Sequence, residues 1–168
     1  YWLTKSSFEP RLAFYDKNDE NMRKSAVRYA GKANAIGVSS DQGIVDYFAV
    51  EENQYKEYDE IALFTHSGSE RWVGFVRTQG QILRLETDSN AYRAIGEHLS
   101  SSGVFTLATA CNIGGNPSGQ AYINSVSATM GRPVRAPANT VAFWSNGFMR
   151  QVDQNNKAVP WAWYSNTK

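Results

Sequence analysis

A chain of 168 residues falls within the range of one domain and is long enough to bury a continuous apolar core. Its composition, 42% hydrophobic and 20% charged, is that of a globular protein and excludes a disordered chain. The formal net charge is +1 and the basic residues are scattered, so nucleic-acid binding is unsupported, and no run of about 18 apolar residues is present to span a bilayer.

Short β-rich runs alternate with stretches of helical period from residue 11 onward, and this alternation predicts strand-helix-strand units. Residues 12–15 predict a first strand. The polar segment 16–19 then supplies a turn and an N-cap for a helix that Gly31 ends. Residues 35–38 predict a short buried strand, which completes the first unit.

A second helix is expected after Ser40 or Asp41, either of which can cap it. It leads into a charged stretch, 51–60, that we expect to be solvated. Residues 61–65 are apolar throughout, as in a central parallel strand covered by helices on both faces. This strand delivers His66 at its carboxyl end.

Two β-rich runs, 72–76 and 81–85, predict a hairpin. A helix is expected to begin at 88–89 and to end at Gly103, a residue suited to terminate it. His98 falls within this helix, where we expect a structural or surface role.

The second strongly apolar strand covers 104–110 and delivers Cys111. A helix with Pro117 near its first position and Gly131 after its end follows. The prediction is therefore one α/β domain over residues 1–168, with a mostly parallel central sheet, helices on both faces and a C-terminal antiparallel extension. The strands of that last region are expected at 133–136, 140–144, 148–152 and 158–164.

The cysteine and histidine content limits the chemistry. The chain has one cysteine, Cys111, and only two histidines, His66 and His98. An internal disulfide and a multi-cysteine zinc site are therefore excluded, and a histidine-rich metal centre is not favoured, whereas carboxylate sites for magnesium or calcium stay open on composition. We expect no metal, no cofactor and a free thiol at Cys111.

His66 and Cys111 are the candidate catalytic residues. Both follow apolar strands, and the carboxyl ends of parallel strands are where an open α/β sheet binds ligands. If the strands are neighbours, about 4.8 Å apart, the imidazole and the sulfur come within reach, and an imidazolium favours the nucleophilic thiolate. In this hypothesis Cys111 attacks a carbonyl carbon, His66 moves the protons, and backbone N–H groups of Gly68 and Cys111 hold the oxyanion.

The segments "IALFTHSG" and "VFTLATACNIGG", with the continuation "GQAYINSVSATMGRPVRAP", resemble the histidine and cysteine blocks of caspase-like (clan CD) cysteine peptidases, including bacterial self-cleaving toxin domains. The resemblance covers about residues 11–144, and the order and spacing of His66 and Cys111 agree with it. It implies a three-layer caspase-like sandwich and a Cys-His dyad that cleaves protein or peptide substrates through a thioester.

The chain departs from the family pattern at two places. Ser67 stands between His66 and Gly68, where family members carry glycine directly after the histidine, and Asn112 follows Cys111 in place of the caspase signature. Specificity for cleavage after aspartate is therefore not implied. We find no third catalytic residue in the sequence. Ser67, Asn112 and Trp144 are weaker candidates for substrate binding.

Two alternatives to a peptidase stay open. One is another thiol hydrolase, such as a deamidase effector, that uses the same pair of residues. The other is a binding module on the same fold that has lost catalysis. Because the chain begins at Tyr1 and has no signal-peptide pattern, we expect part of a longer protein, secreted or delivered into a target cell, with a cognate inhibitor as a further partner.

Overall fold

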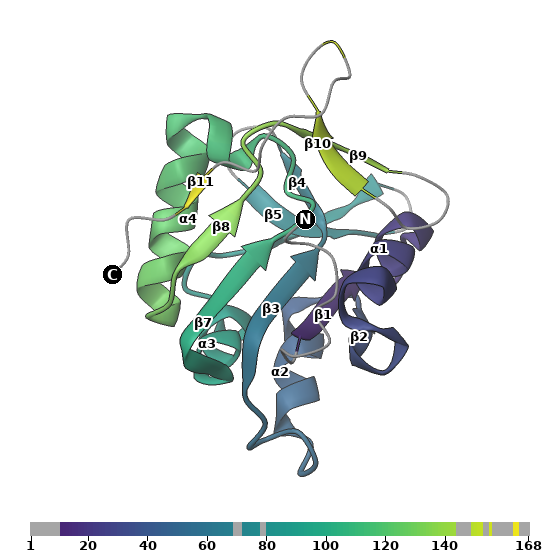
Figure 1. The fold of residues 1–168 in the computed structure, drawn as a ribbon, viewed down its shortest axis with the longest axis vertical. Helices are drawn as coiled ribbons and strands as arrows, with labels where there is room; N and C mark the ends of the chain where they lie inside the picture. The colour runs from purple at the N-terminus through teal and green to yellow at the C-terminus, as the bar shows by residue number, and fades with distance from the viewer. Residues whose placement is uncertain are drawn as a thin grey trace.

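The computed structural model describes residues 11–68, 72–77, 80–143, 149–152, 155 and 163–164. The strands of its central sheet are β1 (Arg11–Asp16), β2 (Ala35–Val38), β3 (Tyr58–Phe64), β7 (Leu99–Leu107), β8 (Val134–Ala136) and β11 (Trp163–Tyr164). They lie in the order β11-β8-β7-β3-β1-β2 (Figure 1). All neighbouring pairs are parallel except β11 with β8, so the predicted α/β class and mostly parallel sheet are confirmed.

Two smaller antiparallel sheets accompany the central sheet in the described part of the chain. One consists of β4 (His66–Gly68), β5 (Trp72–Val76) and β6 (Ile82–Leu85), and the other of β9 (Thr140–Phe143) and β10 (Met149–Val152). The predicted hairpins are thus confirmed as strand pairs. Residues 66–68, for which no strand was expected, form β4 and extend the first hairpin by one strand.

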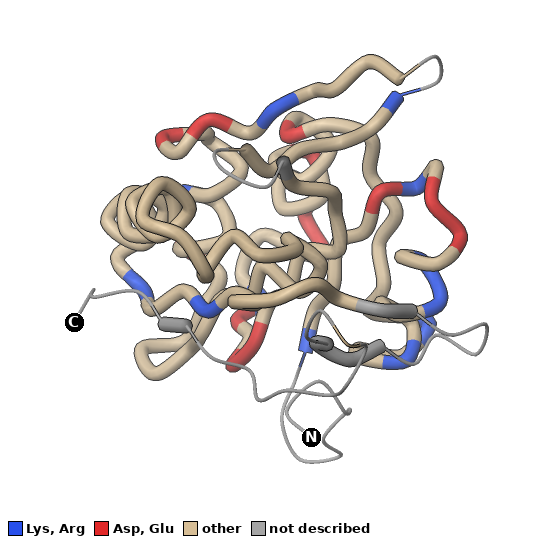
Figure 2. Tube along the Cα trace, turned by 90° about the horizontal axis from the view of Figure 1, so that it is seen from above, with Lys and Arg blue, Asp and Glu red and all other residues tan. Residues whose placement is uncertain are grey.

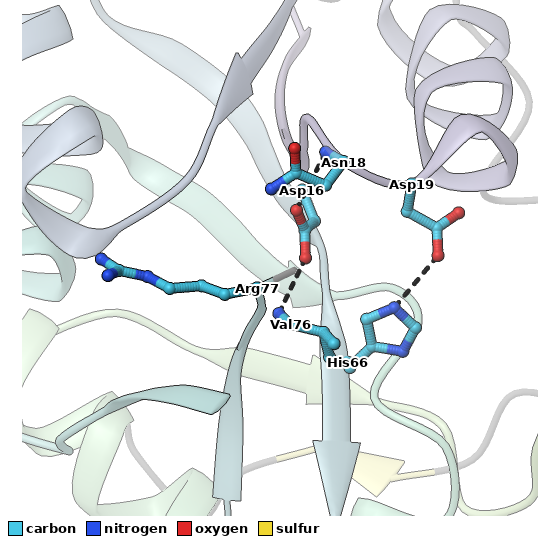
Figure 3. A pocket seen from close by; sticks show the side chains of 6 residues that line it. All are labelled: Asp16, Asn18, Asp19, His66, Val76 and Arg77. Carbon is cyan, nitrogen blue, oxygen red and sulfur yellow. Dashed lines mark hydrogen bonds and ion pairs between the residues drawn. The ribbon is translucent and has the colours of Figure 1, made fainter. Parts of the chain in front are cut away.

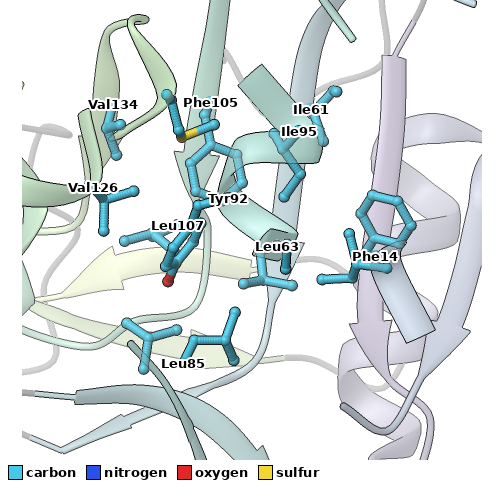
Figure 4. Close-up of a cluster of buried hydrophobic side chains, with 14 of the residues drawn as sticks. Phe14, Ile61, Leu63, Leu85, Tyr92, Ile95, Phe105, Leu107, Val126 and Val134 are labelled. Atoms are coloured by element: carbon cyan, nitrogen blue, oxygen red, sulfur yellow. The ribbon is translucent and has the colours of Figure 1, made fainter. Parts of the chain in front are cut away.

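Helices lie on both faces of the central sheet. They are α1 (Glu20–Ala30), α2 (Asp41–Ala49), α3 (Asn90–Glu97) and α4 (Pro117–Met130). On one face, Ala13, Ala62 and Phe64 of the sheet share a buried cluster with Met22 and other side chains of α1. On the opposite face, alternate side chains of the same strands join a larger cluster with α2, α3 and α4 (Figure 4), including Phe14, Leu63, Phe105, Ile95 and Val126. Period-2 alternation along each strand supplies the two layers.

Local capping explains where the helices begin and end. The Ser40 hydroxyl accepts from the N–H of Gly43 at the start of α2, and the Asn116 side chain accepts from the N–H of Gly119 at the start of α4. Pro117 occupies the first turn of α4, and Gly131 ends it with φ of 66°, a left-handed conformation that favours glycine. The predicted helix boundaries are confirmed here because these signals are local.

Three sequence predictions are wrong in detail. The helix expected to reach Gly103 ends at Glu97, and Gly103 lies inside β7. His98 terminates α3 because its Nδ1 bonds the Lys56 carbonyl oxygen at 2.8 Å and its ring stacks on Phe48, both contacts with distant segments. His98 is therefore buried and structural.

The other two corrections concern burial. The strand 35–38 was expected to be buried, but Ala35, Ile36 and Gly37 are only half-buried because β2 is an edge strand. The stretch 51–60 was expected to be solvated throughout, but its last residues belong to β3, and Glu60 is only 8% exposed.

The charged residues in the described part of the chain do not form a single patch of one sign. Figure 2 shows basic residues at several separate places along the described trace, with acidic residues between them. None of the helices in the described ranges is both long enough and apolar enough to cross a membrane.

A buried pair of tyrosine hydroxyls joins α3 to α4. The hydroxyls of Tyr92 and Tyr122 lie 2.8 Å apart, and that of Tyr122 donates to the Leu85 carbonyl oxygen at 2.7 Å. Burial raises the pKa of both phenols well above the ordinary value. Because the pKa of each phenol is higher in the folded than in the unfolded chain, the neutral phenols favour the folded state. This contribution to the free energy of unfolding is fully present below the unfolded pKa, near 10, and is lost as the pH rises through the folded pKa.

We predict unequal costs for removing the two hydroxyls. Tyr92→Phe should lower the free energy of unfolding by about 1 kcal/mol, because Tyr122 keeps its acceptor. Tyr122→Phe should cost about twice as much, because it leaves both the Leu85 carbonyl and the Tyr92 hydroxyl without this partner. Urea denaturation at pH 7 measures both values, and equal midpoints for the two variants would contradict the assigned direction of donation.

Candidate functional site

The site lies where the strand order of the central sheet reverses. β1 is flanked by β2 on one side and by β3 on the other, and β3 continues outward to β7 and β8. Such a reversal creates a crevice beyond the carboxyl ends of the two strands that flank it, here β1 and β3, because the chain continues from them toward opposite faces of the sheet. Here β1 ends at Asp16 and leads into residues 17–19, and His66 follows β3.

Asp19 joins this segment to His66. One carboxylate oxygen accepts from the N–H of Met22 at 3.1 Å and caps α1. The other lies 3.0 Å from Nε2 of His66, with side-chain exposures of 27% for the aspartate and 38% for the histidine. A carboxylate that holds one ring nitrogen fixes the tautomer and orientation of the imidazole, which leaves Nδ1 to exchange protons.

Sequence reasoning missed the contact between Asp19 and His66. The pattern identified the segment 16–19 only as a turn and a cap, and the structure shows that Asp19 is the residue of this segment that caps α1. Its second role depends on a residue 47 positions away, which no local pattern reports. The signal present in the sequence was limited to the placement of each residue directly after a predicted strand, because ligand sites of α/β sheets lie at the carboxyl ends of strands.

Asp16, the last residue of β1, connects β5 to the region around Asp19 and His66. It is 1% exposed, and its two oxygens accept from the N–H groups of Asn18 and Val76, at 3.1 and 3.0 Å. A pocket of about 330 Å³ opens here and is lined by Asp16, Asn18, Asp19, His66, Val76 and Arg77 (Figure 3). In this view His66 and Asp19 point toward each other, and the Arg77 side chain extends away from them.

The loop that carries Cys111 lies beside the segment that carries His66. Past the end of β7, the Thr109 hydroxyl donates to the Thr65 carbonyl oxygen at 2.6 Å. Two residues further along each segment, the Ser67 hydroxyl donates to the Cys111 carbonyl oxygen at 3.3 Å. These bonds continue the pairing of β3 with β7 beyond the strands. The condition that the two strands be neighbours is met, since β3 and β7 pair directly.

The Cys111 thiol is partly buried. Its side chain packs against the cluster under α1, and its sulfur accepts from the Val141 N–H at 3.4 Å. Among the described residues no hydrogen bond joins the His66 ring to this sulfur. Catalytic hydrogen bonds are often long or misaligned in enzymes without substrate, so proton exchange between the two groups stays a prediction.

The expected oxyanion donors differ in their present bonds. The Cys111 N–H donates to the Thr109 carbonyl oxygen at 3.0 Å, so it must leave or share that bond to serve an oxyanion. Gly68 lies in β4 opposite Trp72. A role for either amide in holding an oxyanion therefore stays a prediction.

The three candidate substrate-binding residues lie in different surroundings. The Ser67 hydroxyl donates a hydrogen bond to the Cys111 carbonyl oxygen and so joins the two segments. Asn112 adopts φ of 60° and ψ of 3°, and its side-chain amide donates to the Thr140 hydroxyl at 3.3 Å. Trp144 lies outside the described residues.

Comparison with known proteins leaves the family open. No family model matches this chain, and no curated protein matches it. The described ranges also contain no group of three or more histidine, cysteine, aspartate or glutamate side chains arranged to hold a metal ion. The functional argument therefore rests on the geometry around His66, Asp19 and Cys111.

Proposed function

We propose that the chain is a cysteine peptidase of caspase-like architecture in which Cys111 is the nucleophile and His66 the acid and base. The observation that carries the proposal is the Asp19–His66 pair, 3.0 Å apart, at the crevice of the sheet and on a segment bonded to the Cys111 loop. The hydrogen bond between Ser67 and Cys111 holds the segment of this pair beside the segment that carries the single thiol of the chain, which supports a joint role for the three groups. Helices on both faces of a parallel sheet support the three-layer caspase-like sandwich.

The chemistry follows from the bond to Asp19. With Nε2–H directed at the carboxylate, Nδ1 of His66 takes the proton from the Cys111 thiol, and the sulfur attacks the carbonyl carbon of the scissile amide. The C–N bond breaks as the imidazolium returns its proton to the leaving amine, which leaves a thioester. His66 next takes a proton from water, whose oxygen attacks the thioester, and the C–S bond breaks to release the acid and restore the thiol.

This sequence requires the sulfur and Nδ1 to meet. Cys111 and His66 are both partly exposed, so each side chain can be reached from solvent. Rotation about the Cα–Cβ bond of Cys111 is the smallest change that redirects the sulfur, because the backbone on both sides is hydrogen-bonded. The pocket beside His66 is the natural place for a substrate side chain or main chain.

The test compares wild type with Cys111→Ala. Each is incubated with a mixture of intact proteins from a bacterial and a eukaryotic lysate, and new peptide N-termini are counted by mass spectrometry. We expect new termini with wild type and none with Cys111→Ala. A mass gain of about one unit on glutamine or asparagine without new termini would support a deamidase, by the chemistry of amide hydrolysis to acid.

Absence of both products, together with a thiol that alkylates no faster than free cysteine, would support the binding module. Expression of the same two proteins inside cells, with growth as the readout, tests the bacterial toxin effector role. Growth arrest that depends on Cys111 is the expected result, and equal toxicity of both proteins would contradict an effector that acts through its thiol.

A further inference from the structure

Asp16 is a buried acidic residue that the proposed mechanism does not use. It is the last residue of β1 and is 1% exposed. None of the ion pairs among the described residues involves it. Because a carboxylate buried without an opposite charge costs free energy, hydrogen bonds must offset that cost. The bonds that Asp16 makes therefore indicate what it holds together.

On one side, Asp16 shapes the segment that carries Asp19. One side-chain oxygen accepts from the N–H of Asn18 at 3.1 Å, and the backbone carbonyl oxygen of Asp16 accepts from the N–H of Asp19 at 2.9 Å. The next residue, Lys17, donates its N–H to the Val38 carbonyl oxygen at 3.0 Å, which anchors the turn to the end of β2. The backbone at Asp19 is therefore fixed relative to the central sheet.

On the other side, Asp16 bonds the sheet that contains His66. Its second side-chain oxygen accepts from the N–H of Val76 at 3.0 Å. Val76 is the last residue of β5, and Gly74, two residues before it, lies opposite His66 in β4. With a rise of about 3.4 Å per residue, this bond lies only about 7 Å along β5 from the residue that faces His66.

No strand pairing fixes the β4-β5-β6 sheet against β1, because it is a separate sheet in the described part of the chain. Its buried side chains join the larger apolar cluster and are those of Val73, Phe75 and Leu85. Apolar packing is non-directional and does not by itself align two hydrogen-bonding groups. Within the described ranges, two hydrogen bonds join residues 16–19 to this sheet, one between Val76 and Asp16 and one between His66 and Asp19.

We propose that Asp16 is a positioning residue that sets the 3.0 Å contact between Asp19 and His66. The inference rests on the proposed function, because it explains how the carboxylate and the imidazole of that mechanism are held in register. One carboxyl group bonds backbone N–H groups on both sides of the contact, so the two side chains meet with their directions already fixed. Asp16 takes no part in proton transfer and acts through these two residues.

The first test is Asp16→Asn. An ionised carboxylate only accepts, whereas asparagine has one accepting oxygen and an NH₂ group that donates. The variant therefore places a donor against one of the two N–H groups, of Asn18 or of Val76. Since a misplacement of about 1 Å can cost on the order of 100-fold in rate, we expect kcat to fall by about 10- to 100-fold. KM should change by less than about twofold, because the lost positioning acts on the chemical step.

A double-mutant cycle separates positioning from a general effect on folding. In an Asp19→Asn background, Asp16→Asn should lower kcat by less than about twofold further, because the contact that it positions is already lost. Tyr92→Phe is the control for lost stability, since Tyr92 lies in the cluster on the opposite face, and it should leave kcat unchanged. The same factor for Asp16→Asn in both backgrounds would overturn the inference, as would full kcat in Asp16→Asn.

A second measurement, native-state hydrogen exchange, does not need turnover. The amides of β4 and β5 should exchange about tenfold faster in Asp16→Asn than in wild type, the effect of one lost hydrogen bond to a charged acceptor. In Tyr92→Phe these amides should keep the wild-type rate, because their local opening does not break the Tyr92 bond. Equal acceleration in both variants would overturn the inference, because it shows release of the β4-β5-β6 sheet only by global unfolding.

If Asp16→Asn does not fold, an ester at Val76 takes its place in both experiments. The α-hydroxy analogue of valine removes the N–H that donates to Asp16 and keeps both side chains, and the expected results are the same. The proposed function fails separately, when wild type itself produces no new peptide N-termini, and hydrogen exchange then still decides the role of Asp16. Failure of this inference alone leaves wild type active and the exchange of β4 and β5 unchanged in Asp16→Asn.

Discussion

Asp19→Asn should lower the turnover of the proposed peptidase by a factor on the order of 100 to 10,000 and leave the fold intact. The asparagine keeps an oxygen that can accept from the Met22 N–H, so the cap of α1 survives. Its neutral amide cannot stabilise an imidazolium at His66, and it does not select the tautomer that leaves Nδ1 free. The measurement is kcat at saturating substrate, with thermal unfolding of the same samples.

The matched control is Asp19→Ala, which removes both functions of the carboxylate. It should show the same loss of turnover and also a loss of about 1 kcal/mol in the free energy of unfolding, because the α1 cap disappears. The two variants together separate catalysis from folding. Full turnover in Asp19→Asn would show that the contact between Asp19 and His66 is structural only.

Glu60→Gln should cost about 3 kcal/mol or more in the free energy of unfolding, the largest effect on stability that we predict. The Glu60 carboxylate lies against the guanidinium groups of Arg11 and Arg135, whose side chains are 6% and 14% exposed, and it accepts from the Tyr29 hydroxyl. The substitution removes the negative charge that balances both guanidinium groups, and these two cations are largely buried. Since small domains are stable by about 5–15 kcal/mol, the variant should approach the limit of folding.

The matched control is Glu20→Gln, which removes the same charge from an exposed ion pair with Arg23. Its urea midpoint should stay within error of wild type, because solvent already screens the pair. If Glu60→Gln and Glu20→Gln unfold at the same urea concentration, the buried cluster does not contribute as its geometry indicates.

The sequence predicted most elements because their signals are local. The apolar runs of β3 and β7 and the caps at Ser40 and Gly131 are each read from a few neighbouring residues. The helix that was extended too far shows the limit of such signals. Leu99 follows Ile95 at helical spacing, yet it begins β7 because it pairs with Tyr58, a contact that is not visible in the local pattern.

The candidate site was also predictable only in its local features. Composition and local pattern were enough to single out one thiol, Cys111, and one histidine, His66, and to place each after an apolar strand. Only the folded chain decided what these groups touch, because Asp19 and Val141 are 47 and 30 residues from their partners. Hydrogen-bond partners at that separation depend on strand order and loop path, which arise from the packing of the whole sheet rather than from neighbouring residues.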